Sequence, residues 1–163
     1  MGIEEDLIRG NKGEDLAKEY LKKRHNALHV FKVPGYFPEY DLISVFERGK
    51  IRTVEVKIDY VCKQTGNIAI EYGHRNHLSG ILISTADWYV IIAPPHIIGM
   101  KRRDLLYYLR ENEFKEVNGG DSDMSRFYLV PLDNLEAQSF VDIWDYRDEK
   151  VVEPVKYERL QDI

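Results

Sequence analysis

Residues 88–93 read WYVIIA, an unbroken apolar run that stops at Pro94-Pro95. A strand with one face in water alternates apolar and polar residues, whereas a short continuous apolar run is typical of a strand buried on both faces. We therefore expect this segment to be an inner strand of a sheet that is covered on both sides.

The rest of the chain supplies candidate elements for such a sheet. A helix is expected over residues 3–24, with an apolar face formed by Leu7, Leu16, Ala17, Tyr20 and Leu21. Extended segments separated by turn signals are expected at residues 29–33, 40–46, 51–59 and 67–71. They are followed by a helix at 101–112, a loop at Gly119-Gly120, a strand at 126–131 and a short helix at 134–140. This order predicts an α/β fold with a mixed central β-sheet flanked by helices.

The composition restricts the class of protein. The chain has 163 residues, of which 44% are hydrophobic and 31% charged, a balance typical of a folded domain. No segment approaches the roughly 20 apolar residues of a membrane helix, and the acidic N-terminal segment lacks a signal-peptide pattern. Cys62 is the single cysteine, which excludes a disulfide framework and suits a cytoplasmic protein. We expect one domain over residues 1–145 and a polar, irregular C-terminal extension over residues 146–163.

Residues 53–59 read TVEVKID and alternate apolar with polar side chains. In a strand, this alternation places Glu55, Lys57 and Asp59 on one face and the apolar residues on the other. Glu55 and Lys57 are therefore expected to be neighbours. Taken alone, the pattern is also typical of a half-buried strand with a solvated polar face.

A second carboxylate opens the preceding strand. Asp41 stands just before the apolar pair Leu42-Ile43, and Arg48-Gly49 then turns the chain back. An antiparallel hairpin of this kind brings Asp41 and Glu55 within reach of each other. Two adjacent carboxylates repel unless a cation lies between them, and hard oxygen ligands suit Mg²⁺. Lys57 would then orient or deprotonate an attacking water, or neutralise charge on a phosphate.

Glu14 falls inside the apolar arc of the first helix, with Leu7, Ala17 and Leu21 around it. A charged side chain on a buried stripe is costly unless it is paired or binds a metal. Two interpretations stay open. Glu14 is a third carboxylate of the site, or it reaches water at the edge of the stripe or pairs with Lys18.

The order of Glu14 on a first helix, then Asp41, then Glu55-Val56-Lys57 resembles the PD-(D/E)XK nuclease superfamily. It looks most like phage endonucleases and archaeal Holliday junction resolvases, over roughly residues 10–95. The resemblance implies a restriction-endonuclease-like core. It implies that Asp41 and Glu55 bind the metal together with the backbone carbonyl of Val56, that Lys57 is the catalytic lysine, and that Glu14 is an auxiliary ligand.

One departure from the family pattern concerns the proline. Pro38 lies before Asp41 without adjoining it, which leaves Glu39 as a rival for the ligand position. We prefer Asp41 because it stands at the start of the apolar run of its strand.

The stretch from Thr65 to Trp88 is similar to phage members of the same superfamily. Glu71 ends the next strand, so it either faces the site, where it would touch the metal or its water shell, or anchors Arg75. Ser79-Gly80 is expected to make a tight backbone turn near the substrate, as glycine permits, with a plain loop as the alternative.

Basic residues gather at 22–24, at Lys63 with Arg75, and at 101–103. The net charge of −5 argues against a passive nucleic-acid coat, so an enzyme acting on DNA would need a local positive groove. For DNA contacts we favour Lys63 and Arg75, which flank the catalytic strands, together with Ser79 and Gly80.

The sequence thus predicts a metal-dependent endodeoxyribonuclease that hydrolyses DNA phosphodiester bonds with Mg²⁺, for which Mn²⁺ can substitute. Branched, Holliday-junction-like DNA is one expected substrate, and symmetric cutting of it would require a homodimer. One alternative is a non-catalytic DNA-binding module of the same fold. Another is a nuclease of this fold that acts on RNA or on DNA ends, since a fold and a metal site do not fix the substrate.

Overall fold

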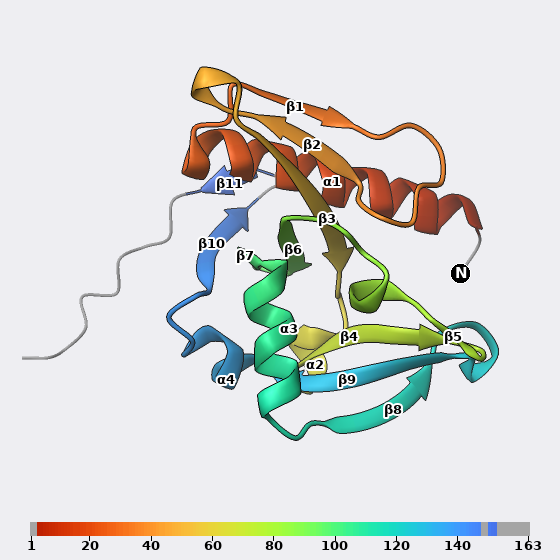
Figure 1. Ribbon diagram of the computed structural model, residues 1–163. Coiled ribbons are helices and arrows are strands. Elements are labelled where there is room, and N and C mark those ends of the chain that lie inside the picture. Colours follow the sequence, from red (N-terminus) through yellow and green to blue (C-terminus); the bar gives the residue numbers. More distant parts are fainter. Residues whose placement is uncertain (1–2, 148–149, 153–163) are drawn as a thin grey trace, which may run out of the picture.

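The computed structural model describes residues 3–147 and 150–152 (Figure 1). The helices are α1 (Ile3–His25), α2 (Cys62–Thr65), α3 (Arg102–Glu111) and α4 (Leu132–Glu136), and the 3-10 turns are η1 (Glu47–Gly49), η2 (Gly80–Leu82) and η3 (Asp121–Asp123). The strands are β1 (His29–Lys32), β2 (Leu42–Val45), β3 (Ile51–Ile58), β4 (Asn67–His74), β5 (His77–Leu78), β6 (Trp88–Ala93), β7 (His96–Lys101), β8 (Lys115–Gly119), β9 (Ser125–Pro131), β10 (Asp142–Arg147) and β11 (Lys150–Val152). These strands form two sheets.

The larger sheet is mixed and has the strand order β1-β2-β3-β6-β7-β10-β11. Strands β3 and β6 run parallel, from Val54↔Trp88 to Ile58↔Ile92, whereas the other pairs of this sheet are antiparallel. Between β3 and β6 the chain leaves the sheet and forms α2, β4, β5 and η2. The fold is therefore α/β with a mixed central sheet, as the sequence predicts.

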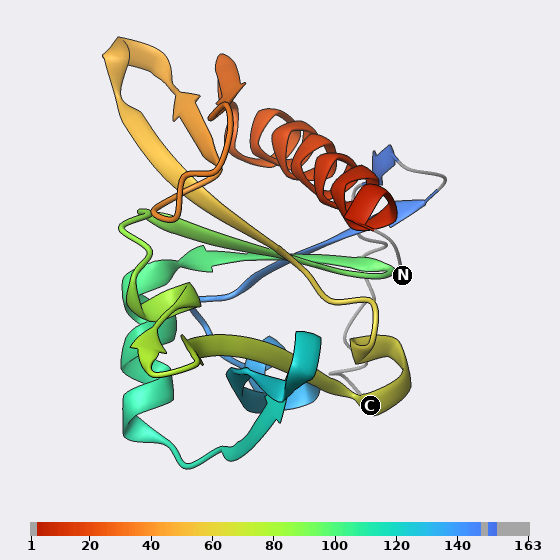
Figure 2. The ribbon, with the colours of Figure 1, turned by 90° about the vertical axis from the view of Figure 1, so that its right-hand side faces the viewer.

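The smaller sheet is antiparallel, with the order β5-β4-β9-β8. Figure 2 shows α1 on one side of the central sheet, with this smaller sheet and α3 on the opposite side. The central sheet is thus covered on both faces, by a helix on one and by a second sheet and a helix on the other.

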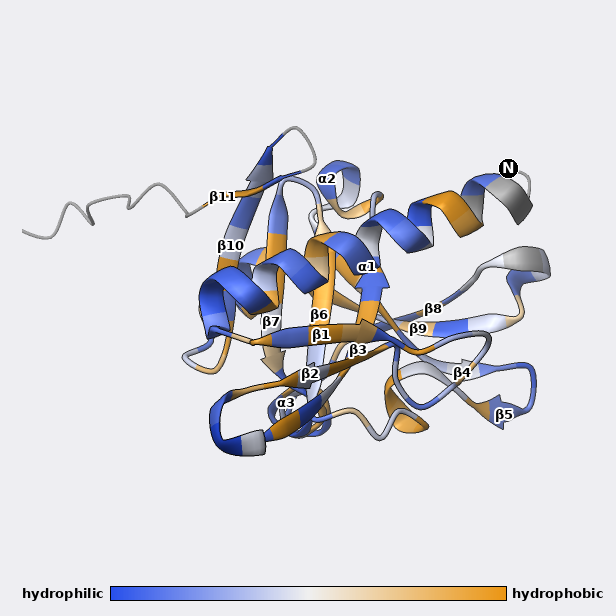
Figure 3. Cartoon of the chain, turned by 90° about the horizontal axis from the view of Figure 1, so that it is seen from above, coloured by the Kyte–Doolittle hydropathy of each residue, from blue (hydrophilic) through white to orange (hydrophobic). Residues whose placement is uncertain are grey.

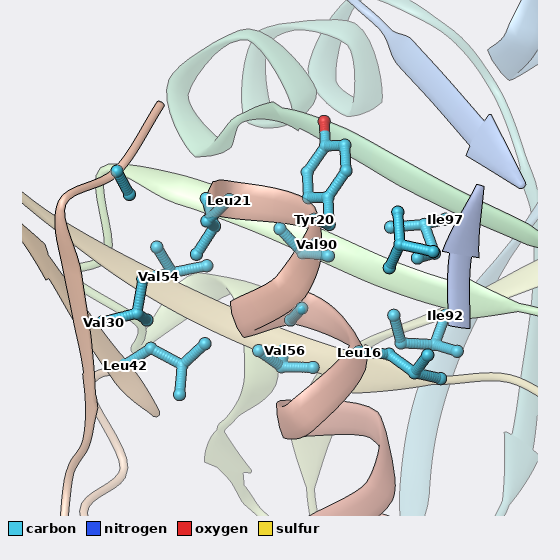
Figure 4. Packing of buried hydrophobic residues seen from close by; sticks show 13 residues of the cluster. Leu16, Tyr20, Leu21, Val30, Leu42, Val54, Val56, Val90, Ile92 and Ile97 are labelled. Atoms are coloured by element: carbon cyan, nitrogen blue, oxygen red, sulfur yellow. The ribbon is translucent and has the colours of Figure 1, made fainter. Parts of the chain in front are cut away.

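The first hydrophobic core lies between α1 and the central sheet (Figure 4). Ala17, Tyr20 and Leu21 on α1 are fully buried. They pack on a group of sheet residues that includes Val30, Leu42, Val54, Val56, Val90, Ile92 and Ile97. The predicted apolar face is wrong at Leu7, which is 67% exposed. The N-terminal turns of α1 extend beyond the part of the sheet that its C-terminal half covers (Figure 3), and Leu7 and Ile8 in these turns are exposed.

The second hydrophobic core lies between the central sheet, the smaller sheet and α3. Strand β6 serves both cores. Val90 and Ile92 face α1, while Tyr89 and Ile91 face the smaller sheet, and all four are essentially inaccessible to solvent. The prediction of a strand buried on both faces at residues 88–93 is confirmed.

Three other segments differ from the sequence-based expectation. No strand was expected directly after Pro94-Pro95. In the structure these prolines turn the chain back into β7, which pairs with β6 from Ala93↔His96 to Trp88↔Lys101. Strands β10 and β11 carry the sheet to residue 152, where we expected irregular chain beyond about residue 145, and the rest of the predicted extension, 153–163, lies outside the described residues. Helix α4 spans residues 132–136 instead of 134–140. Within the described ranges, no helix has the length and apolar character needed to cross a bilayer.

Close packing of α1 on β7 leads to a prediction about stability. A methyl group at Gly99 would collide with the Tyr20 hydroxyl, which is fixed by donating to Asp142 Oδ2 at 2.7 Å. Gly99→Ala should therefore lower the free energy of unfolding by about 1–3 kcal/mol, measured by urea denaturation. Gly10→Ala is the control, because space around Gly10 is open and alanine favours the helix by up to about 1 kcal/mol. Equal destabilisation by both substitutions would contradict the packing described.

Candidate active site

The candidate site lies at an open edge in the middle of the central sheet. Strand β2 pairs with β3 from Val45↔Ile51 to Leu42↔Val54 and ends there. Strand β3 continues to Ile58 and keeps β6 as its neighbour on the other side. The second half of β3 therefore faces the residues that precede β2, and Asp41 is the first of them.

Asp41 is bound to the edge of β3 through both its backbone and its carboxylate. Its amide donates to the carbonyl of Val54 at 2.9 Å, and its Oδ2 accepts the amide N–H of Val56 at 2.7 Å. The N–H and the C=O of one strand residue point to the same side of the strand. The carbonyl of Val56 therefore points to the edge at which the Asp41 carboxylate lies.

Glu55 and Lys57 lie on the face of β3 that is turned toward the smaller sheet, because the alternate residues Val54 and Val56 belong to the core under α1. The Lys57 Nζ is 2.7 Å from Glu55 Oε1. Glu55 is only 5% exposed. The alternative interpretation, a half-buried strand with a solvated polar face, therefore does not hold at this position. The structure thus brings together the acid and the lysine that the sequence placed on one face.

Burial raises the pKa of both carboxyls. For Glu55, desolvation is the largest cause, Lys57 opposes it, and repulsion from Asp41 adds to it. For Asp41, desolvation again raises the pKa, against the Val56 N–H and Lys57. Desolvation alone would lower the pKa of Lys57, but Tyr89, Glu55 and Asp41 together outweigh it and raise that pKa. The lysine therefore stays charged beside two carboxylates that repel each other, an arrangement that a bound cation would stabilise.

Glu14 is half-buried on α1, and its Oε2 is 3.6 Å from Lys32 Nζ. This ion pair is with β1 and not with Lys18 on the same helix, which we had considered. Desolvation raises the pKa of Glu14, Lys32 lowers it, and the charge of Asp41 raises it further. Glu14 therefore lies close enough to Asp41 to feel its charge, on the α1 side of the open edge.

The donor set at this edge suits Mg²⁺. Asp41 and Glu55 supply carboxylate oxygens, and Val56 supplies a carbonyl directed to the same edge. Across the described ranges, no three His, Cys, Asp or Glu side chains stand close enough to hold a metal ion on their own. Mg²⁺ is commonly held by one or two carboxylates plus waters and substrate phosphates, so the two acids and the carbonyl fit it without a third acid.

Glu71 extends from β4 and accepts a hydrogen bond from Ser79 Oγ at 2.6 Å. Of the two expected alternatives, the anchoring of Arg75 by Glu71 is wrong, because Glu71 binds Ser79 and Arg75 binds Met124; a contact of Glu71 with the metal or its water shell stays a prediction. Gly80 follows with φ +53°, and a Cβ there would collide with the carbonyl of Glu71. The predicted tight turn at Ser79-Gly80 is confirmed, and it packs against the strand that carries Glu71.

The two basic residues that we favoured for DNA contacts lie apart. Lys63 is exposed on α2. Arg75 is exposed in the turn after β4, where its amide donates to the carbonyl of Met124 at 2.7 Å and its Nε donates to Met124 Sδ at 3.2 Å. Their role in binding DNA stays a prediction.

Two residues near the site, Tyr89 and Ser84, were missed by sequence reasoning, and Arg102 was expected only as part of the basic cluster at 101–103. Tyr89 is paired in register with Glu55, and its hydroxyl is buried without a hydrogen-bond partner among the described residues. Ser84 is buried within hydrogen-bonding reach of the Glu55 carboxylate and donates to the carbonyl of Glu39 at 2.9 Å. Desolvation lowers the pKa of Arg102, while the negative charge of Glu55 opposes that shift. Tyr89 can be placed beside Glu55 only when the parallel register of β3 and β6 is known, and the sequence does not reveal that register.

No protein-family model, no curated protein and no solved structure matches this chain. The contacts of its own residues define an α/β protein in which a buried glutamate pairs with a partly exposed lysine beside an open sheet edge.

Asp59, directly after the end of β3, has a different environment from Asp41. Asp59 Oδ1 accepts the amides of Val61 at 3.0 Å and Cys62 at 2.9 Å, and Oδ2 accepts the amide of Ala69 at 2.9 Å. Asp59 thus joins the end of β3 to β4, whereas Asp41 carries an unfavourable charge. The two aspartates should respond in opposite ways to replacement by asparagine.

Asp41→Asn should leave the free energy of unfolding unchanged or higher near pH 7. The raised pKa of Asp41 means that its ionised form is disfavoured in the folded state. Asparagine is uncharged, so it removes this free-energy cost near pH 7. The difference between the variant and the wild type should decrease at lower pH, where the wild-type carboxyl is protonated. Asp59→Asn should destabilise by about 1–3 kcal/mol, because an amide group cannot accept all of these N–H bonds. Urea denaturation of both variants at pH 7 and pH 5 measures this, and a large loss of stability in Asp41→Asn would refute it.

Proposed function

We propose that this protein is a metal-dependent nuclease that hydrolyses phosphodiester bonds in DNA with Mg²⁺ or Mn²⁺. The observation that carries the proposal is the buried Glu55 carboxylate beside Lys57 at 2.7 Å, with the Asp41 carboxylate on the Val56 amide at the same edge. Phosphodiester hydrolysis needs hard oxygen ligands and a fixed positive charge together, and this edge supplies both.

Asp41, Glu55 and the carbonyl of Val56 would hold the metal, with Glu14 as an auxiliary acid from α1. When bound there, Mg²⁺ polarises the phosphate and lowers the pKa of a coordinated water. Lys57 is charged, so it donates hydrogen bonds and cannot accept a proton. Of the roles open to it, we therefore favour orienting the attacking water and neutralising charge that builds up on the phosphate.

The arrangement of the strands also supports a restriction-endonuclease-like core. The β2–β3 hairpin carries Asp41 and Glu55, β6 runs parallel to β3, and α1 covers the face behind them. This agrees with the PD-(D/E)XK resemblance of the sequence. Branched DNA as substrate and a homodimer that cuts it symmetrically are part of the same proposal, and cleavage of synthetic junctions together with light scattering tests them.

A non-catalytic module of this fold is the alternative from another class. Ionised Asp41 and Glu55 are both disfavoured by burial, and the charge of Asp41 raises the pKa of Glu55 and of Glu14. A protein that only binds DNA gains nothing from this arrangement and would be more stable with amides there. The presence of both acids therefore favours a catalytic function over a non-catalytic module.

Lys57→Ala should lower the rate of plasmid cleavage in Mg²⁺ by about 10²–10³-fold, the usual effect of removing one donor that stabilises transition-state charge. Lys50→Ala is the matched control, because Lys50 is an exposed lysine at the turn of the same hairpin. Its rate should equal that of the wild type. Full activity in Lys57→Ala, or no cleavage by the wild type with either Mg²⁺ or Mn²⁺, would refute the proposed nuclease function.

Metal binding can be measured separately from turnover. Titration calorimetry with Mg²⁺ should show binding that weakens at least about tenfold in Asp41→Asn, because one of two carboxylate ligands is lost. Glu47→Gln, at an exposed acid in η1, should bind as the wild type does. Identical titrations for all three proteins would exclude Asp41 as a ligand.

A further inference from the structure

A cleft of about 550 Å³ lies between the central sheet and the smaller sheet and begins at Lys57. Its floor includes Tyr89 and Ile91 of β6, and Phe127 of β9 lines the opposite wall. Figure 2 shows the two sheets that enclose it facing each other. The cleft therefore shares Lys57 with the candidate active site, and most of its lining is apolar.

The lining of the cleft combines two cationic side chains with an exposed aromatic ring. The guanidinium of Arg9, from α1, lies 5.5 Å from the centre of the Tyr60 ring, and both residues line the cleft together with Lys57. Tyr60 is 42% exposed, so its ring is accessible. Glu71 also lines the cleft, with its carboxylate held by Ser79 at 2.6 Å. Lys57 and Arg9 thus place two positive charges in a lining that also holds the acids Asp59 and Glu71, and Tyr60 supplies a ring on which a base can stack.

The size of the cleft restricts what can enter it. Its volume falls within the range of small-molecule sites, roughly 300–1,000 Å³. A base that is paired and stacked within a duplex cannot reach such a site unless it leaves the stack, which requires a few kcal/mol. An unpaired nucleotide needs no such step. Aromatic and cationic groups around an apolar interior match its base and its phosphate.

We propose that this inter-sheet cleft binds one unpaired nucleotide of the substrate strand next to the scissile phosphate, so that the enzyme prefers single-stranded DNA segments to intact duplex. This inference rests on the proposed nuclease function, because it places the phosphate at Lys57. It adds a substrate class that the metal site itself does not specify.

Binding in the absence of divalent metal tests the inference without depending on cleavage. We would measure the fluorescence anisotropy of a labelled 12-nucleotide single strand and of the blunt duplex of the same length, both in EDTA. The single strand should bind at least about tenfold more tightly. Tyr60→Ala should weaken its binding by about 5–150-fold, because stacking of one base contributes about 1–3 kcal/mol. Arg9→Gln should weaken it too.

A second cation–aromatic pair serves as the matched control. Arg110 lies 5.7 Å from the centre of the Tyr107 ring on α3, and neither residue lines the cleft. Tyr107→Ala and Arg110→Gln should leave single-strand binding within twofold of the wild type. Thermal melting of each variant identifies any that is not folded. A 2-aminopurine base in the single strand should lose fluorescence on binding to the wild type and keep it with Tyr60→Ala.

The outcomes separate this inference from the proposed function. Equal affinity for single strand and duplex, or equal loss in Tyr60→Ala and Tyr107→Ala, overturns the cleft as a nucleotide site even if the protein cuts DNA in Mg²⁺. Conversely, Tyr60-dependent binding of single strands in a protein that never cuts DNA supports the cleft and refutes the nuclease.

Discussion

Strands β3 and β6 lie side by side in the same direction, and a parallel pair cannot be joined by a tight turn. The connection must leave the sheet and return, and in this protein it does so through α2, β4 and η2. Strand β4 then pairs with β9, and β9 with β8, so the connection becomes the centre of a second sheet. The parallel pairing thus accounts for the second hydrophobic core and for the wall opposite Lys57.

The site occupies the place where regular pairing stops. Because β2 ends at Leu42, the edge of β3 beyond Val54 is free to accept a side chain, and the Asp41 carboxylate takes the position that a strand carbonyl would hold. The acids there are disfavoured by burial, while the large cores on both sides of β6 stabilise the fold around them. The residues that stabilise the fold are therefore different from the acids at this edge.

Local patterns in the sequence were sufficient for the features that depend on one or two neighbouring strands. The alternation around Glu55 and the apolar run of β6 each follow from side-chain periodicity, and the β2–β3 hairpin joins two adjacent segments. The smaller sheet depends on β4 and β9, which are far apart in the chain, so no local pattern marks it. Tyr89 was missed because a continuous apolar run does not show which residue faces which core. Leu7 was wrongly assigned to the buried face of α1, because periodicity does not show where a helix extends beyond the sheet that it covers.

The carboxylate of Asp59 joins the end of β3 to the start of α2 and to β4. It stands between Lys57, which faces the proposed scissile phosphate, and Tyr60, which faces the proposed base. Three residues of chain span at most about 11 Å, and the bonds of Asp59 fix how that length is folded. The spacing between Lys57 and Tyr60 is therefore set by the hydrogen bonds of Asp59, and the proposed nuclease would cut a strand at a constant distance from the base that Tyr60 holds.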